Sequence, residues 1–251
     1  MSLTMGSLFD GIGGFPLAAQ HIVIQTLWAS EIEPFPIKVT MERFPEMVHV
    51  GDITKLNGAD LPPVDIICGG SPCQNLSLAG NRSGLKGTQS GLFYEMIRVI
   101  KEMRDADRNR GQTAQFVRPR WCIWENVPGA FSSGEPPCED FRIVLESFAG
   151  ISLGAVSIPR PESGKWKPAG RILLGDTFSL AWRTLDAQYW GVAQRRARVY
   201  LIVDLAGPSA AQILFDEKGL FGHSSPGQGE EQTPAATIGT GAEDTGWFDT
   251  S

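Results

Sequence analysis

Residues 64–74 read VDIICGGSPCQ, an apolar run that ends in two glycines and leads into a cysteine between proline and glutamine. A short apolar run bounded by glycines is typical of a strand buried on both faces of a parallel sheet. In open α/β sheets, ligands bind in the crevice outside the carboxyl ends of the strands. Because Cys73 follows such a strand on a loop stiffened by proline, we interpret it as a reactive residue rather than a structural one.

Further apolar runs alternate with helical patterns through about residue 205, which predicts an α/β fold with a mostly parallel sheet flanked by helices. Strands are expected at 4–9, 26–30, 64–68, 121–124 and 198–205, and helices at 13–21, 35–44, 92–103 and 141–148. Gly150 follows the last helical pattern and is expected to end that helix. The segment from Pro159 to Gly175 is rich in proline, glycine and charge, so we expect an inserted surface loop there.

The 251 residues are 42% hydrophobic and 20% charged, which fits one large globular domain. We expect a cofactor-binding and catalytic unit over residues 1–206. Residues 207–251 are expected to be a flexible linker or the start of a recognition region, because periodicity disappears after Gly222. No apolar stretch approaches about 18 residues and no signal peptide is evident, so we expect a cytoplasmic protein without a membrane partner.

Four cysteines and three histidines show no metal-ligand spacing, so no metal site is expected. Cys68 and Cys122 lie inside apolar runs and are interpreted as small buried hydrophobic residues. The net charge of −6 argues mildly against binding of nucleic acid by bulk electrostatics. Basic residues gather locally at 108–110, 118–120 and 195–198, and the first two groups are interpreted as solvated surface.

The stretch FDGIGG at 9–14 follows the first expected strand and opens the first helix. Its glycines allow a tight turn and a close approach to a ligand. Glu31, at the end of the second strand, suits a ribose diol, although a solvated acid at a helix start is the alternative. Asp52 could face an adenine amino group. Because the full GxGxxG spacing and a Walker lysine are both missing, a nucleoside without phosphates is favoured.

Two further polar groups stand at strand ends. Glu125 follows the tryptophan-rich strand 121–124, where partial desolvation would raise its pKa and suit it to proton donation. The alternative is an ordinary turn acid. Arg196 and Arg198 enter the last strand and point to the same side of it, where guanidinium groups fix carboxylates, phosphates or base carbonyls. A solvated strand start is the alternative for this pair.

Taken in order, these motifs resemble those of the C5-cytosine DNA methyltransferases. The resemblance rests on FDGIGG at 9–14, Glu31, GDI at 51–53, GGSPCQNLS at 69–77, GLF at 91–93, ENV at 125–127 and QRRAR at 194–198. It covers residues 4 to about 205. It implies a Rossmann-like methyltransferase fold, S-adenosylmethionine as a cofactor that carries no phosphates, and double-stranded DNA as the substrate.

The resemblance also implies residue roles. It assigns the cofactor site to Phe9, Asp10, Gly11, Ile12, Gly13, Glu31, Ile32, Asp52, Ile53, Pro72 and Leu92. Cys73 would add as a thiolate to C6 of a cytosine flipped out of the duplex, and Glu125 would hold N3 and the exocyclic amine. Asn126 would order the loop. Arg196 and Arg198 would orient Glu125, the Cys73 loop or the flipped base.

The resemblance is incomplete at the C-terminus. Residues 222–251 lack the target-recognition region and the closing motifs of the family, so we expect a truncated chain of restriction-modification or phage type. One alternative is methylation of cytosine in tRNA, and another is an inactive remnant that binds cofactor or a partner. A dinucleotide-dependent oxidoreductase would share the fold but would leave Cys73, Glu125 and the arginine pair unexplained.

Overall fold

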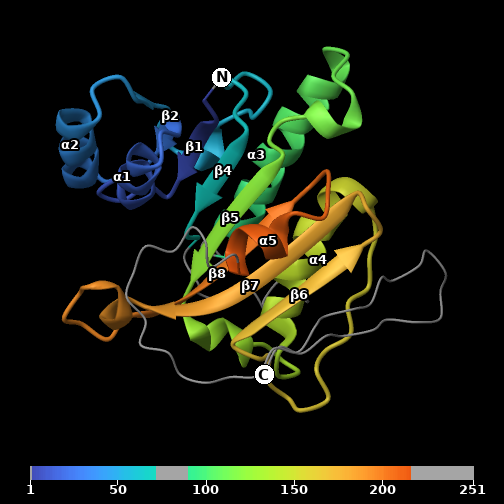
Figure 1. The fold of residues 1–251 in the computed structure, drawn as a ribbon. Helices are drawn as coiled ribbons and strands as arrows, with labels where there is room; N and C mark the ends of the chain where they lie inside the picture. Colours follow the sequence, from blue (N-terminus) through green and yellow to red (C-terminus); the bar gives the residue numbers. More distant parts are fainter. Residues whose placement is uncertain (1, 72–89, 216–251) are drawn as a thin grey trace.

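The computed structural model describes residues 2–71 and 90–215, which are built around an eight-stranded sheet in the order β3-β2-β1-β4-β5-β8-β7-β6. The strands are β1 (Thr4–Leu8), β2 (Gln25–Ser30), β3 (Val48–His49), β4 (Ile66–Gly69), β5 (Trp121–Asn126), β6 (Ala169–Leu174), β7 (Phe178–Asp186) and β8 (Ala197–Asp204). Strands β1 to β5 pair in parallel, and β8, β7 and β6 extend the sheet antiparallel (Figure 1). The predicted α/β fold with a mostly parallel sheet is confirmed.

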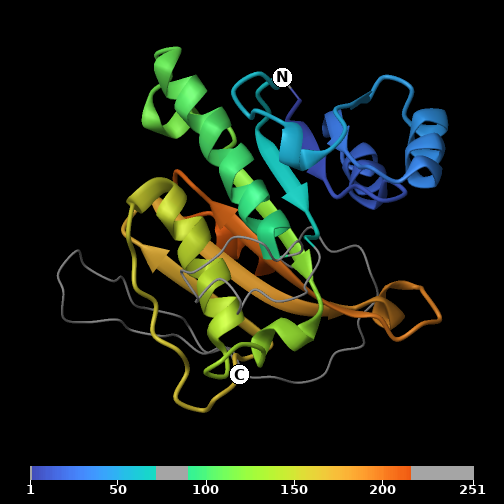
Figure 2. The ribbon, with the colours of Figure 1, turned by 180° about the vertical axis from the view of Figure 1, so that it is seen from behind.

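Helices cover both faces of this sheet. They are α1 (Gly14–His21), α2 (Pro34–Arg43), α3 (Ser90–Asn109), α4 (Glu139–Leu153) and α5 (Ala210–Phe215). Helices α3 and α4 lie together on one face, as the view from behind shows (Figure 2). Helices α1 and α5 pack against the opposite face.

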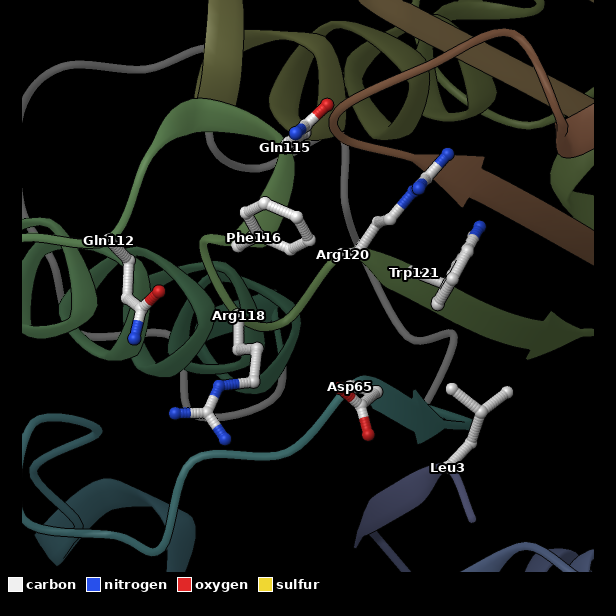
Figure 3. Close-up of a pocket in the computed structure, with 8 residues that line it drawn as sticks. All are labelled: Leu3, Asp65, Gln112, Gln115, Phe116, Arg118, Arg120 and Trp121. Carbon is white, nitrogen blue, oxygen red and sulfur yellow. The ribbon is translucent and has the colours of Figure 1, made fainter. Parts of the chain in front are cut away.

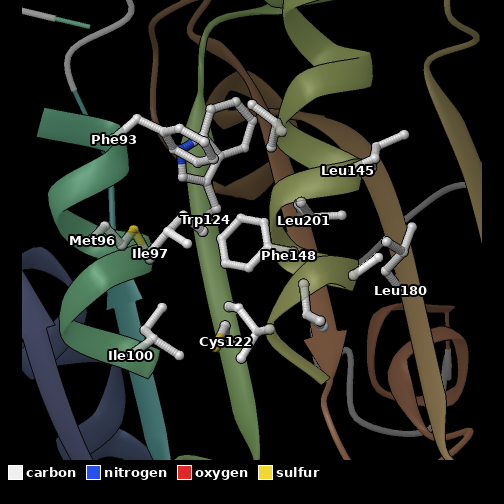
Figure 4. Packing of buried hydrophobic residues seen from close by; sticks show 14 of the residues in the cluster. Phe93, Met96, Ile97, Ile100, Cys122, Trp124, Leu145, Phe148, Leu180 and Leu201 are labelled. Carbon is white, nitrogen blue, oxygen red and sulfur yellow. The ribbon is translucent and has the colours of Figure 1, made fainter. Parts of the chain in front are cut away.

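The main core lies between the sheet and helices α3 and α4. Because successive strand residues point to opposite faces, Ile67 packs toward α3, whereas its neighbours Ile66 and Cys68 pack with residues of α1. Removing these apolar side chains from water is the main favourable contribution to folding. Figure 4 shows the packing of Phe93, Met96, Ile97, Ile100, Cys122, Trp124, Leu145, Phe148, Leu180 and Leu201.

Cys68 and Cys122 are fully buried, as the sequence predicted. Burial raises the pKa of the Cys122 thiol to about 12 and shifts the pKa of the Cys68 thiol upward as well. A buried thiol of raised pKa forms little thiolate, so neither residue is a nucleophile.

Two predictions about local structure were wrong. The expected surface loop 159–175 contains strand β6, and its Trp166 is buried against the ring of Trp182. Gly170 on β6 lies directly under that Trp182 ring, so the absence of a side chain permits the pairing. Gly150 does not end a helix, because α4 continues to Leu153 and is followed by Gly154 at φ 77°.

Packing continues past the expected boundary at residue 206. The Ser179 hydroxyl donates to the Gly207 carbonyl at 2.8 Å and accepts from the Ala210 N–H at 3.1 Å. Helix α5 then packs on β7 and β8, so residues 207–215 belong to the same folded unit. In the ranges 2–71 and 90–215, no helix has the length and apolar character needed to cross a membrane.

Candidate functional site

The register of the parallel strands places several of the predicted motifs at one edge of the sheet. Leu8, the last residue of β1, lies beside Ser30 on β2 and Gly69 on β4, and Gly69 lies beside Trp124 on β5. The chain segments that follow these four strands therefore leave the sheet side by side. In α/β folds this carboxyl edge is where ligands bind.

The glycine loop after β1 has an unusual backbone. Phe9, Gly11 and Gly13 have positive φ angles of 55°, 56° and 83°. A positive φ is costly for phenylalanine, and such strain gathers at functional sites. A Cβ atom added at Gly11 would meet no atom of the described residues within 4 Å, so the backbone there is open to a ligand. The loop can therefore approach a ligand closely.

Glu31 joins this loop to the end of β2. Its Oε2 accepts the Gly11 N–H at 2.8 Å, and its Oε1 accepts the N–H groups of Ile32 and Glu33 at 2.7 and 3.0 Å. The neighbouring side chains of Ile12 and Ile32 are 60% and 63% exposed. Sites for nucleoside-like ligands commonly combine exposed apolar side chains with a few polar groups, such as a carboxylate, that orient the ligand.

Asp10 is buried beneath the same loop. Its Oδ1 accepts the Ser7 hydroxyl at 2.5 Å, whereas its buried Oδ2 has no hydrogen-bond partner among the described residues. Burial raises the pKa of the Asp10 carboxyl to about 6, with a smaller contribution from Glu31 and an opposing one from the Ser7 hydrogen bond. An unpaired buried carboxylate oxygen costs free energy, so a donor or cation from a ligand would complete it.

The remaining predicted cofactor residues lie in different surroundings. Asp52 accepts the Thr54 N–H at 3.0 Å and its hydroxyl at 2.8 Å, and these hydrogen bonds lower the pKa of the Asp52 carboxyl. Ile53 is buried in the main core, and Leu92 is half-buried in the first turn of α3. Pro72 lies outside the described residues.

Glu125 contacts two of the other motifs. A Cβ atom at Gly70 would lie only 2.8 Å from the Glu125 Oε2. On the other side, the Arg198 Nε lies 3.0 Å from the Glu125 Oε1. This pairing follows from the antiparallel register of β5 and β8, which sets Asn126 opposite Val199. Three motifs that are far apart in the sequence thus meet at one carboxylate.

Ser71 anchors the segment that leads to Cys73. The Asn126 side-chain amide donates to the Ser71 carbonyl at 3.2 Å, and the Trp124 indole N–H donates to its hydroxyl at 3.0 Å. Pro72 and Cys73 themselves lie outside the described residues. Sequence reasoning had not identified Ser71 or Trp124 as parts of the site, although both are adjacent to motifs that it used.

A cavity of about 390 Å³ opens next to this cluster and contains the arginine pair. It is lined by Leu185, Ala187, Trp190, Arg196, Arg198 and Tyr200. Burial raises the pKa of the Tyr200 hydroxyl, and the nearby Glu125 adds to that shift. The predicted common side for Arg196 and Arg198 agrees with their place in one cavity.

A second cavity, of about 530 Å³, lies at the opposite, amino edge of the sheet, and no predicted site residue within 2–71 and 90–215 lines it (Figure 3). Its two arginines are held in ion pairs: Arg118 with Asp107 at 3.2 Å and Arg120 with Asp204 at 3.0 Å. Both carboxylates are fully buried. The expectation of simple solvated surface for these arginines was therefore wrong, because they neutralise buried acids.

Comparison with known proteins gives a family match. Residues 3–154 match the family model described as C-5 cytosine-specific DNA methylase. A protein of Escherichia phage P1 named DNA N-6-adenine-methyltransferase is 31% identical over 96% of this chain and 34% of its own length. The type II methyltransferase M.NgoBV of Neisseria gonorrhoeae is 27% identical over 87% of this chain and 47% of its own length. The chain thus spans about a third to a half of the length of these relatives.

Solved structures agree with the fold. A protein described as a DNA modification methyltransferase encoded within an E. coli prophage superposes with a TM-score of 0.53 at 22% identity, covering 81% of this chain and 47% of that one. The S. pombe Dnmt2 methyltransferase gives a TM-score of 0.57 at 17% identity, covering 91% of this chain and 58% of that one. At these identities the likeness concerns the fold alone.

Proposed function

The chain belongs to the C-5 cytosine-specific DNA methylase family, and on that premise we propose that it transfers a methyl group from S-adenosylmethionine to C5 of cytosine in DNA. The proposal takes Cys73 as the nucleophile and Glu125, Asn126, Arg196 and Arg198 as the residues that position it and the base. Since the chain spans only part of its relatives, DNA binding and catalysis by this chain are both part of the proposal.

The observation that carries the proposal is the position of Glu125 between Gly70 and Arg198. The Arg198 guanidinium, 3.0 Å away, fixes the orientation of the carboxylate. Ser71, held by Asn126 and Trp124, brings the chain to within two residues of Cys73. A cytosine bound by Glu125 through N3 and its exocyclic amine would therefore lie close to Ser71, which precedes Cys73 by two residues in the sequence.

The chemistry explains why a thiol is needed there. C5 of cytosine is a poor nucleophile, and a bond from the Cys73 thiolate to C6 places electron density on C5, which then takes the methyl group. Loss of the C5 proton to a base and cleavage of the S–C6 bond release 5-methylcytosine and restore the thiolate. The base must leave the duplex stack to reach such a site.

The described residues at the ends of β1 and β2 fit S-adenosylmethionine, which supplies an electrophilic methyl group on a sulfonium sulfur. Glu31 would hold the ribose hydroxyls, and Ile12 and Ile32 offer exposed apolar surface beside it. The Oδ2 of Asp10, which has no hydrogen-bond partner in the described part of the chain, would accept a donor or face positive charge from the cofactor. Two carboxylates at this position disfavour a phosphate-bearing cofactor.

The test is transfer of a labelled methyl group to DNA, followed by analysis of the modified base. We expect 5-methylcytosine as the product and complete loss of transfer in Cys73→Ala. Recovery of N6-methyladenine, or equal transfer without Cys73, would overturn the proposal. Covalent trapping on DNA containing 5-fluorocytosine gives a second readout, since that base cannot release the thiol after methylation. Cofactor binding by calorimetry without trapping would point to a chain that is inactive on its own.

A further inference from the structure

The turn between β7 and β8 forms an exposed hairpin at the same edge of the sheet as the candidate site. Every residue from 189 to 196 is exposed, and both ribbon views show this turn projecting beyond the body of the molecule (Figures 1 and 2). Because β8 runs antiparallel to β5, the start of β8 lies next to the end of β5, where Glu125 stands. The hairpin is therefore a neighbour of the site rather than a remote loop.

The hairpin is held in one shape by the Asp186 side chain at its base. The Asp186 Oδ1 accepts the N–H groups of Gln188 and Arg196 at 3.2 and 2.8 Å, and its Oδ2 accepts the Gln188 side-chain amide at 3.0 Å. The Ala187 N–H donates to the Arg196 carbonyl at 3.2 Å, and Gly191 makes the turn at φ 84°. A turn pre-organised in this way loses little conformational entropy when it binds a partner.

The chemistry of the tip is aromatic and cationic. Tyr189 and Trp190 are 74% and 45% exposed, and Arg195 and Arg196 are exposed beside them. Within the described ranges 2–71 and 90–215, neither arginine forms an ion pair. In a chain of net charge −6, this is a local positive surface that carries aromatic rings.

We propose that this tip is a DNA-contacting wedge, in which Tyr189 and Trp190 stack on bases next to the flipped cytosine while Arg195 contacts a flanking phosphate. The inference rests on the proposed function, because a base that leaves the duplex exposes the faces of its neighbours. Aromatic side chains stack on any exposed base, and arginines beside them neutralise the backbone. The start of β8 lies next to the end of β5 and Glu125, so the partner that this position favours is the DNA that presents its cytosine there.

The experiment measures the affinity of the chain for a short duplex with one mismatched cytosine, which lowers the cost of extrusion. We expect Tyr189→Ala and Trp190→Ala each to weaken binding by about tenfold, since base stacking on an aromatic side chain contributes to this extent. A 2-aminopurine beside the mismatch should show a smaller fluorescence change in both variants. Tyr189→Phe should bind as the wild type does, because stacking does not need the hydroxyl.

Phe116→Ala is the matched control, because Phe116 is an aromatic residue 61% exposed at the opposite edge of the sheet. It should leave DNA affinity unchanged. Unchanged DNA affinity in both hairpin variants would overturn the wedge. Cofactor binding should stay at the wild-type level in both variants, because the hairpin is exposed and its loss of contacts should not disturb the fold. Wild type that fails to bind the duplex would overturn it too.

The two proposals fail in different ways. A wild-type chain that methylates DNA, with the same KM in Tyr189→Ala, would reject the wedge and keep the proposed function. A wild-type chain that binds the mismatched duplex through Tyr189 but never methylates it would keep the contact and reject the proposed chemistry.

Discussion

At the scale of single residues, the candidate site requires a glycine at position 70, because glycine has no side chain. The Glu125 Oε2 lies only 2.8 Å from the position that a Cβ atom at Gly70 would take, which is closer than such atoms approach. The end of the Glu125 side chain can move aside at little cost in stability, but the carboxylate would then leave its position at Arg198. We expect Gly70→Ala to lower the rate of methyl transfer by about 100-fold, since small misplacements of catalytic groups have effects of that size.

Gly129→Ala is the control for this substitution. Gly129 lies four residues after Glu125, and an added Cβ atom would make only an ordinary contact, 3.8 Å from a Val127 methyl group. The rate of methyl transfer by Gly129→Ala should equal that of the wild type, and thermal unfolding should show that both variants are folded. An active Gly70→Ala enzyme would mean that the orientation of Glu125 is not limiting.

Asp10 gives a prediction about pH. Its pKa is raised from 3.8 to about 6, so the folded state binds more protons than the unfolded state between these values. The stability of the wild type should therefore decrease as the pH rises from 4 to 6, with an upper limit of about 3 kcal/mol. Asp10→Asn should remove this contribution and be more stable than the wild type in urea unfolding above that window. Equal pH dependence in the two proteins would show that Asp10 does not titrate there.

At the scale of elements, Gly150 lies inside α4 rather than at its end. Its φ is not positive, and an added Cβ atom would meet no atom of the residues that the structure describes within 4 Å, apart from the local helix backbone. Glycine in a helix interior is less favourable than alanine by about 0.5–1 kcal/mol, mainly through chain entropy. We expect Gly150→Ala to raise the free energy of unfolding by this amount. A decrease, measured by denaturant unfolding, would reveal a neighbour or a strain that the structure does not show.

The comparison of expected and observed elements shows what local sequence patterns determine. Strands at 4–8 and 121–126 and the helix at 90–109 follow apolar runs whose periodicity is visible without tertiary structure. Strand β6 was missed because its signal is tertiary: Gly170 and Trp182 fit one another across two strands, and Trp166 is buried by rings from elsewhere. Gly150 was misread because glycine after an apolar pattern also occurs inside helices.

At the scale of the whole molecule, the site is assembled from both halves of the sheet. Motifs at the carboxyl ends of parallel strands could be placed together from the sequence, because such ends share one edge. The contact of Arg198 with Glu125 could not be derived in that way, since it depends on β8 pairing antiparallel with β5. The sequence could not show either that the Asp10 Oδ2 has no partner among residues 2–71 and 90–215, because this depends on how Ser7 and the glycine loop pack.

The two halves of the sheet are linked by Asp204, the last residue of β8. This fully buried carboxylate accepts two hydrogen bonds from the Arg120 guanidinium, both at 3.0 Å, and further ones from Ala206 and Ser209. Arg120 immediately precedes β5 and also lies over the Trp121 ring, 4.6 Å from its centre. The start of a parallel strand is thus tied to the end of an antiparallel one.

Asp204→Ala should therefore destabilise the whole sheet rather than one edge of it. Removing the buried partner leaves the partly exposed Arg120 guanidinium and several backbone donors unpaired, which costs about 3 kcal/mol, the lower end of the range for buried ion pairs. Asp105→Ala, which removes an exposed ion pair with Arg108, should cost at most about 1 kcal/mol.

Burial alone would raise the pKa of the Asp204 carboxyl, but hydrogen bonds from Arg120, Ser209 and Ala206 hold it below 3.8. The stability that Asp204 contributes is thus present at pH values above 3.8 and is lost as the pH falls below that value. In urea unfolding, the difference in the free energy of unfolding between the wild type and Asp204→Ala should be largest near neutral pH and smaller in acid. If Asp204→Ala lowered the free energy of unfolding only as much as Asp105→Ala does, Asp204 would not link the two halves of the sheet.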